Sequence, residues 1–98
     1  MPAAGTTSVT ATKSATTFYS DALHLACSDL DPCNPVRLGL ALNFAVFYWE
    51  LLEEKEKAIK LTEITLQSAV EKIDDCVEDT FEDAKYIIQI LRDNLLLW

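Results

Sequence analysis

The sequence contains 98 residues and carries 16 acidic against 8 basic side chains, which gives a formal charge of −8. A charge of this sign repels nucleic-acid phosphates and anionic lipid headgroups, so we expect neither nucleic acid nor a membrane surface as a partner. Half of the residues are apolar, while only 2 are Gly and 3 are Pro. Such a composition suits long helices joined by short turns, and it predicts one small all-α domain.

No transmembrane segment or targeting peptide is predicted. The longest apolar stretch, residues 38–52, includes Asn43 and is shorter than the about 20 residues that span a bilayer. Residues 1–12 have no apolar core of the kind that signal peptides contain. We therefore expect a cytoplasmic protein.

The N-terminal part is predicted to begin loosely and then to form a helix. Residues 1–12 are rich in Thr and Ser, which favour caps and loops over helix interiors, so we expect a frayed lead-in there and a folded part over 13–98. From Ser14 to about Asp29, apolar residues recur at spacings of three and four, which predicts an amphipathic helix. This stripe consists of Ala15, Phe18, Ala22, Leu25 and Ala26.

Two prolines end this helix, and the second of them starts the next one. Pro32 and Pro35 each disfavour the α conformation of the residue before them. Asn34 followed by Pro35 is typical of a helix start, with Asn as the N-cap and Pro in the first helical position. Residues 37–52 are apolar on nearly every face, so we expect this second helix to lie at the centre of the core.

Two further helices are predicted. After a polar link at residues 53–55, apolar residues keep helical spacing from Ala58 to Ile73, with charged residues on the other side. An acidic break near residues 78–80 precedes another such pattern, which starts at Phe81 and runs to Trp98. Because the links are short, we predict an antiparallel array of about four helices.

The second and fourth helices have more apolar surface than one core face requires. One spare stripe consists of Leu42, Asn43, Val46 and Glu50, and the other of Tyr86, Ile87, Ile90, Asn94 and Leu97. Each stripe includes one amide, which can bond both the N–H and the C=O groups of an extended peptide. If the stripes face each other, they line a peptide groove. Alternatively, they pack on further helices and the two asparagines satisfy local backbone groups.

Nothing in the sequence indicates an enzyme, a cofactor or a metal site. Cys27, Cys33 and Cys76 form no Cys-x-x-Cys pair and His24 is the single histidine, so no zinc site can be completed, and we expect reduced thiols. The acidic residues at 74–83 lack the Gly that an EF-hand loop requires. One histidine also leaves no convincing Ser/His/Asp or Cys/His set.

Two stretches of the sequence closely resemble signature segments of the 14-3-3 family. They are Asn34-Pro35-Val36 followed by RLGLALNFAVFYWE at residues 37–50, and IIQILRDNLLLW at residues 87–98. The resemblance extends from about Tyr19 to Trp98 and covers roughly the last third of the family fold. It implies part of a nine-helix antiparallel array that dimerises, and whose groove holds a phosphoserine or phosphothreonine segment in extended form.

The resemblance also implies roles for individual residues. Asn43 and Asn94 would bond the ligand backbone, and Glu50 and Trp98 would close around the ligand. Tyr86 stands where the family usually has Leu and adds a hydroxyl to the groove wall. The apolar wall would consist of Leu42, Val46, Ile87, Ile90 and Leu97.

The resemblance and the composition together predict the partners. In the family, the residues that clamp the phosphate and the helices that form the dimer both precede the part that this chain resembles. Without the clamp, the strong charge-assisted bonds to phosphate are lost, so we expect phosphorylated client proteins to bind the isolated chain weakly or not at all. Apolar surface left without neighbours also predicts self-association or marginal stability. A tetratricopeptide-like interaction module is the alternative, although the 34-residue self-similarity that it requires is missing.

Overall fold

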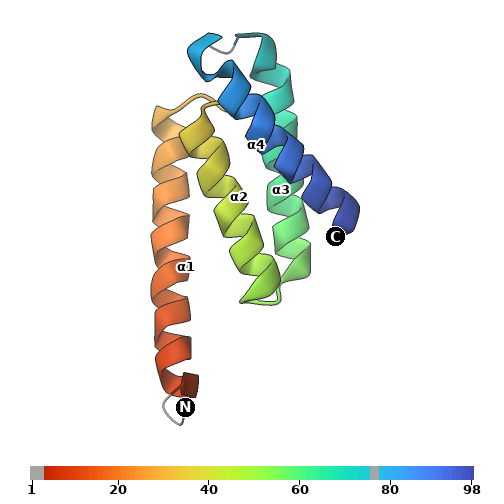
Figure 1. Ribbon diagram of the computed structural model, residues 1–98. Helices are drawn as coiled ribbons and strands as arrows, with labels where there is room; N and C mark the ends of the chain where they lie inside the picture. The colour runs from red at the N-terminus through yellow and green to blue at the C-terminus, as the bar shows by residue number, and fades with distance from the viewer. Residues whose placement is uncertain (1–3, 76–77) are drawn as a thin grey trace.

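Four α-helices make up the computed structural model, which describes residues 4–75 and 78–98 (Figure 1). They are α1 (Ala4–Asp29), α2 (Pro35–Glu50), α3 (Lys55–Lys72) and α4 (Glu78–Leu97), and a short 3-10 turn, η1 (Ile73–Asp75), follows α3. Successive helices run in opposite directions. The predicted all-α array of about four helices is therefore confirmed.

Helix α1 begins well before the predicted start. It is helical from Ala4, so the expectation that regular structure begins near Ser14 is wrong. Ser and Thr cost only about 0.5 kcal/mol per residue relative to Ala in a helix, and extending an existing helix is far easier than nucleating one. Residues 1–3 of the expected lead-in lie outside the described part of the chain, and the division at residue 13 stays a prediction.

The turn between α1 and α2 is held by two side chains. The Oδ1 atom of Asn34 accepts a hydrogen bond of 2.9 Å from the backbone N–H of Val36, and Pro35 is the first residue of α2. The predicted cap is thus confirmed. Arg37 donates from Nη1 to the carbonyl oxygen of Leu30 at 2.9 Å, which ties the first turn of α2 to the end of α1.

The core lies where α2, α3 and α4 meet. Helix α2 contacts each of the other three helices, as expected for a central helix. Leu38 of α2 and Leu91 of α4 are completely buried, and Thr62 of α3 is also buried with its hydroxyl bonded to the carbonyl oxygen of Ala58. Small side chains such as Ala69 let the helices approach closely. The buried core cluster consists of Leu38, Leu66, Ala69, Ala84, Ile88 and Leu91.

The cysteines differ from the prediction at one position. Cys27 is free and exposed, but Cys33 is disulfide-bonded, so the expectation of reduced thiols is wrong for Cys33. Because a disulfide sulfur carries no proton, its 3.7 Å approach to the carbonyl oxygen of Lys72 is a van der Waals contact. Cys76 lies outside the described residues. The pairing was missed because it depends on tertiary proximity, which cysteine spacing does not reveal.

Candidate functional site

A groove of about 390 Å³ lies between α2 and α4, with α1 on one side. We call it the amide groove because Asn43 and Asn94 both line it. Most of the residues predicted to bind a peptide meet here: Leu42, Asn43, Val46, Glu50, Ile90 and Asn94. The predicted α2 stripe therefore shares a groove with two residues of the predicted α4 stripe, Ile90 and Asn94.

Helical spacing explains why these side chains share one groove. On α2 the steps from Asn43 to Val46 and from Val46 to Glu50 are three and four residues, so these side chains form one stripe. Ile90 and Asn94 are four residues apart on α4 and form the opposing stripe. On α2 the groove stripe borders the core, because Leu42 lines the groove and also packs against the core cluster.

The two amides are available to a ligand. Asn43 is exposed and Asn94 is half-buried. Among the described residues, neither side chain has a hydrogen-bond partner, whereas Asn34 is engaged as a cap. The alternative that Asn43 and Asn94 satisfy local backbone groups therefore has no hydrogen bond to support it. Each amide keeps two donors and an acceptor free.

The electrostatics of the amide groove are negative. Among the described residues that line it, Glu50 is the one that carries a charge, and none is Lys, Arg or His. A carboxylate at this position repels an anionic ligand, and no cation offsets that repulsion within the groove. The geometry thus suits a polypeptide backbone better than a phosphate group.

The other predicted site residues lie outside the lining of the amide groove. Ile87 packs against the core, near Gly39 of α2. Leu97 is 81% exposed, and Trp98 stacks on Trp49 with ring centroids 4.6 Å apart. Tyr86 is 71% exposed and lines a different groove.

Sequence reasoning missed three lining residues, namely Tyr19, Phe47 and Leu51. Tyr19 comes from α1, stacks on Phe44 of α2 with a centroid distance of 5.4 Å, and meets the ring of Phe47 at a tilt of 45° and 5.3 Å. Periodicity within a single helix carries no signal for such a contact, because it arises only when two helices pack. Phe47 and Leu51 follow Asn43 at helical spacing and could have been included in the α2 stripe.

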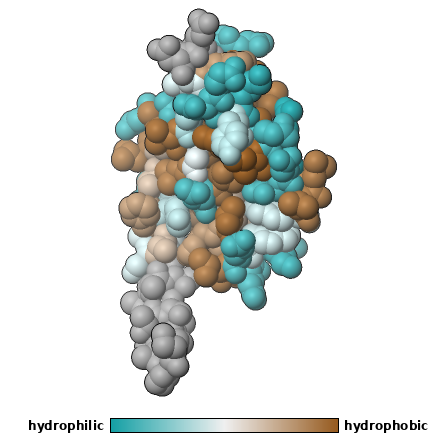
Figure 2. Space-filling model, viewed as in Figure 1, coloured by the Kyte–Doolittle hydropathy of each residue, from teal (hydrophilic) through white to brown (hydrophobic). Residues whose placement is uncertain are grey.

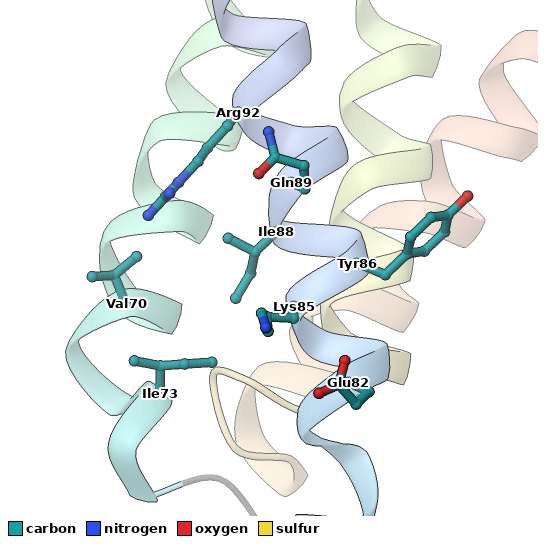
Figure 3. Close-up of a pocket in the computed structure, with 8 residues that line it drawn as sticks. All are labelled: Val70, Ile73, Glu82, Lys85, Tyr86, Ile88, Gln89 and Arg92. Atoms are coloured by element: carbon teal, nitrogen blue, oxygen red, sulfur yellow. The ribbon is translucent and has the colours of Figure 1, made fainter.

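A second groove, of about 460 Å³, lies between α3 and α4, and we call it the α3/α4 groove (Figure 3). Figure 3 shows Tyr86 pointing away from the apolar side chains of this groove. Its amide, Gln89, already donates from Nε2 to Oδ1 of Asp93 at 3.0 Å. The lining residues are Val70, Ile73, Glu82, Lys85, Tyr86, Ile88, Gln89 and Arg92.

Neither a metal cluster nor a membrane-spanning helix is found in the part of the chain that the structure describes. No three His, Cys, Asp or Glu residues come together there as a metal site would require. None of its helices combines the length and the apolar character needed to cross a bilayer.

Comparison with known proteins gives a consistent result. The family model of the 14-3-3 proteins matches residues 3–98. The chain is 43% identical to 14-3-3-like protein B of Glycine max over 91% of its own length and 36% of that protein. It is 40% identical to 14-3-3 protein beta/alpha-1 of Oncorhynchus mykiss over 98% of its own length and 39% of that protein. The chain thus spans little more than a third of these relatives.

Proposed function

Because the chain belongs to the 14-3-3 family, we propose that it contributes part of a phosphopeptide-binding groove and that the amide groove is this part. The observation that carries the proposal is the pair of amides, Asn43 and Asn94, which line one groove from two helices without any partner among the described residues. Family membership also removes the reason to retain the tetratricopeptide-like alternative.

The groove would hold an extended ligand mainly through its backbone. Asn43 and Asn94 each offer two donors and one acceptor, so together they bond the main chain without reading the ligand's sequence. Each such bond contributes only about 1 kcal/mol net. Leu42, Val46 and Ile90 form an apolar wall beside the amides. Alternate side chains of an extended peptide would rest on this wall.

Phosphate would add little to the affinity of the isolated chain. Charge-assisted bonds to phosphate are the strong part of such recognition, and the described lining of the amide groove includes Glu50 but no cation. We therefore expect the isolated chain to bind phosphopeptides weakly or not at all. For the whole protein we propose an adaptor role without catalysis, in which phosphorylated client proteins are the ligands.

An NMR titration tests this proposal. A phosphoserine peptide and the same peptide without phosphate are added separately to the 15N-labelled chain, at concentrations up to about 1 mM. This range detects a dissociation constant of about 1 mM, which corresponds to a binding free energy of about −4 kcal/mol. We expect both peptides to shift the side-chain amide signals of Asn43 and Asn94. The amide of Asn34, which is engaged as a cap, is the internal control and should not move.

Two outcomes would contradict the proposal. Low-micromolar affinity that depends on the phosphate would refute the expected weak binding. Shifts that appear at Gln89 in the α3/α4 groove, and not at Asn43 and Asn94, would refute the assignment of the site.

We also propose that the chain associates with itself. Phe18 and Leu25 are 65% and 62% exposed, and their spacing of about two turns puts them on one face of α1. Figure 2 shows apolar side chains reaching the surface between polar ones on the viewed face. Sedimentation equilibrium should show concentration-dependent association, which the double variant Phe18→Ser with Leu25→Ser reduces. A compact monomer at high concentration would contradict this proposal.

A further inference from the structure

The two tryptophans of the chain stack on each other at the edge of the structure. Trp49 lies in the last turn of α2 and Trp98 directly follows α4. Their ring centroids are 4.6 Å apart and the ring planes differ by 7°. A centroid separation above about 4.5 Å between nearly parallel rings is typical of favourable offset stacking. The stack therefore joins the C-terminal ends of two helices that both line the amide groove.

A third residue holds the same cluster. The Nζ atom of Lys55, the first residue of α3, lies 5.0 Å from the centroid of the Trp49 ring. This distance falls within the about 6 Å that a cation–π interaction requires. The ends of α2, α3 and α4 thus meet in one cluster of three side chains, which we call the tryptophan clasp: Trp49, Trp98 and Lys55.

Among the residues that the structure describes, few other side chains hold the last turn of α4 in place. Leu96 and Leu97 are 86% and 81% exposed, and Leu95 is the one leucine of this turn that packs against the core cluster. Among the described residues, Leu95 and the stacked Trp98 supply the packing of this turn.

This turn also carries Asn94. The backbone N–H of Trp98 donates to the carbonyl oxygen of Asn94 at 2.8 Å. When the indole of Trp98 is fixed against Trp49, this hydrogen bond is fixed as well, and so is the backbone from which the Asn94 side chain reaches the amide groove. Fraying at Trp98 would break this bond and release the backbone around Asn94.

We propose that the tryptophan clasp positions Asn94 in the amide groove, so that Trp98 acts as a positioning residue. The inference rests on the proposed role of Asn94 in binding a peptide backbone. The positioning role is additional to the ligand contact that family resemblance implies for Trp98, because it arises from the stacking of the indole on Trp49.

The test uses the ligand-free 98-residue chain and three variants at the end of α4. Trp98→Ala removes the stack, Trp98→Phe keeps a smaller aromatic ring, and Leu96→Ala is the matched control because Leu96 is exposed in the same turn. Hydrogen exchange at the backbone amides of residues 95–98 reports the order of the turn. The side-chain amide signals of Asn94 report its placement.

We expect Trp98→Ala to speed exchange at residue 98 by about tenfold and to shift the Asn94 side-chain amide. Trp98→Phe should restore most of the protection, and Leu96→Ala should leave both readouts near wild type. If Trp98→Ala behaves like Leu96→Ala in both readouts, the positioning role is wrong. Because no ligand is present, this result is independent of the peptide titration that tests the proposed function.

A second measurement keeps both indoles and tests the part that Lys55 plays. Stacked indoles couple and give a paired positive and negative band in circular dichroism, and the only two tryptophans of the chain form this stack. Lys55→Met should weaken the band pair, because Trp49 loses its cation. Lys60→Met, on the same helix, is the control and should leave the band pair intact. An unchanged band pair in Lys55→Met would show that Lys55 does not help to hold the Trp49–Trp98 stack.

Discussion

The two grooves that flank α4 differ in size, charge and the state of their amides. The α3/α4 groove is the larger, at about 460 against 390 Å³, and two cations, Lys85 and Arg92, line it. Its one amide, Gln89, is bonded to Asp93. The amide groove is smaller and has no lining cation, but both of its amides are free of partners among the described residues.

This contrast teaches that volume alone does not identify a peptide site. An extended ligand exposes a row of backbone donors and acceptors, and it gains affinity from groups that are free to bond them. Asn43 and Asn94 meet that condition from opposite helices, whereas Gln89 would first have to release Asp93. Charge alone would favour the α3/α4 groove as a phosphate site, because the cations that would attract phosphate line that groove.

The largest effect should come from the buried leucine that anchors α4 between the two grooves. Leu91→Ala leaves a cavity at a position with no exposure and should lower the free energy of unfolding by about 3 kcal/mol. Urea denaturation measures this loss. Leu96→Ala, at an exposed position of the same helix, should change stability by less than about 0.5 kcal/mol. Equal losses in the two variants would mean that α4 is not anchored through its buried face.

The second effect separates the two grooves by their amides. The double variant Asn43→Leu with Asn94→Leu keeps the side-chain volume but removes the donors and acceptors, and it should weaken peptide binding by about tenfold or more. Gln89→Leu, in the α3/α4 groove, should leave binding unchanged. NMR titration with an unphosphorylated peptide measures both. Weaker binding in Gln89→Leu alone would reverse the assignment of the two grooves.

The smallest effect tests the charge of the amide groove. Glu50→Lys removes the one lining carboxylate and adds a cation, so the phosphoserine peptide should bind about fivefold tighter. Salt should erase most of the gain, because Glu50 is exposed and its interactions are screened. Glu82→Lys, in the α3/α4 groove, makes the same change of charge and should leave the affinity unchanged. An equal gain from both variants would indicate general attraction and not a site.

Local signals predicted much of the fold. Asn34 with Pro35 gave the start of α2 correctly, because capping depends on residues adjacent in sequence. The start of α1 at Ala4 differs from the prediction because Thr and Ser favour caps and loops, whereas the cost of each one within a helix is small. The disulfide bond of Cys33 was missed because it depends on how the helices are placed in space.

The residues of the candidate site could be predicted where their spacing along a single helix decides which side they occupy. Stripes on α2 and α4 placed Asn43 and Asn94 correctly in one groove, once the helices were assumed to face each other. Periodicity could not foresee Tyr19, which enters from α1, nor the stacking that takes Trp98 onto Trp49. Both are contacts between helices, and the spacing of residues within one helix does not determine the angle at which two helices cross.

The central position of α2 also determines how the molecule should come apart. Its core stripe holds Leu38, its groove stripe holds Asn43, and it contacts all three other helices. Displacing α2 would therefore disrupt the core and the proposed binding groove in one cooperative transition. By mass action, any peptide that occupies the groove should raise the melting temperature of the entire chain, so occupancy and folding are thermodynamically linked.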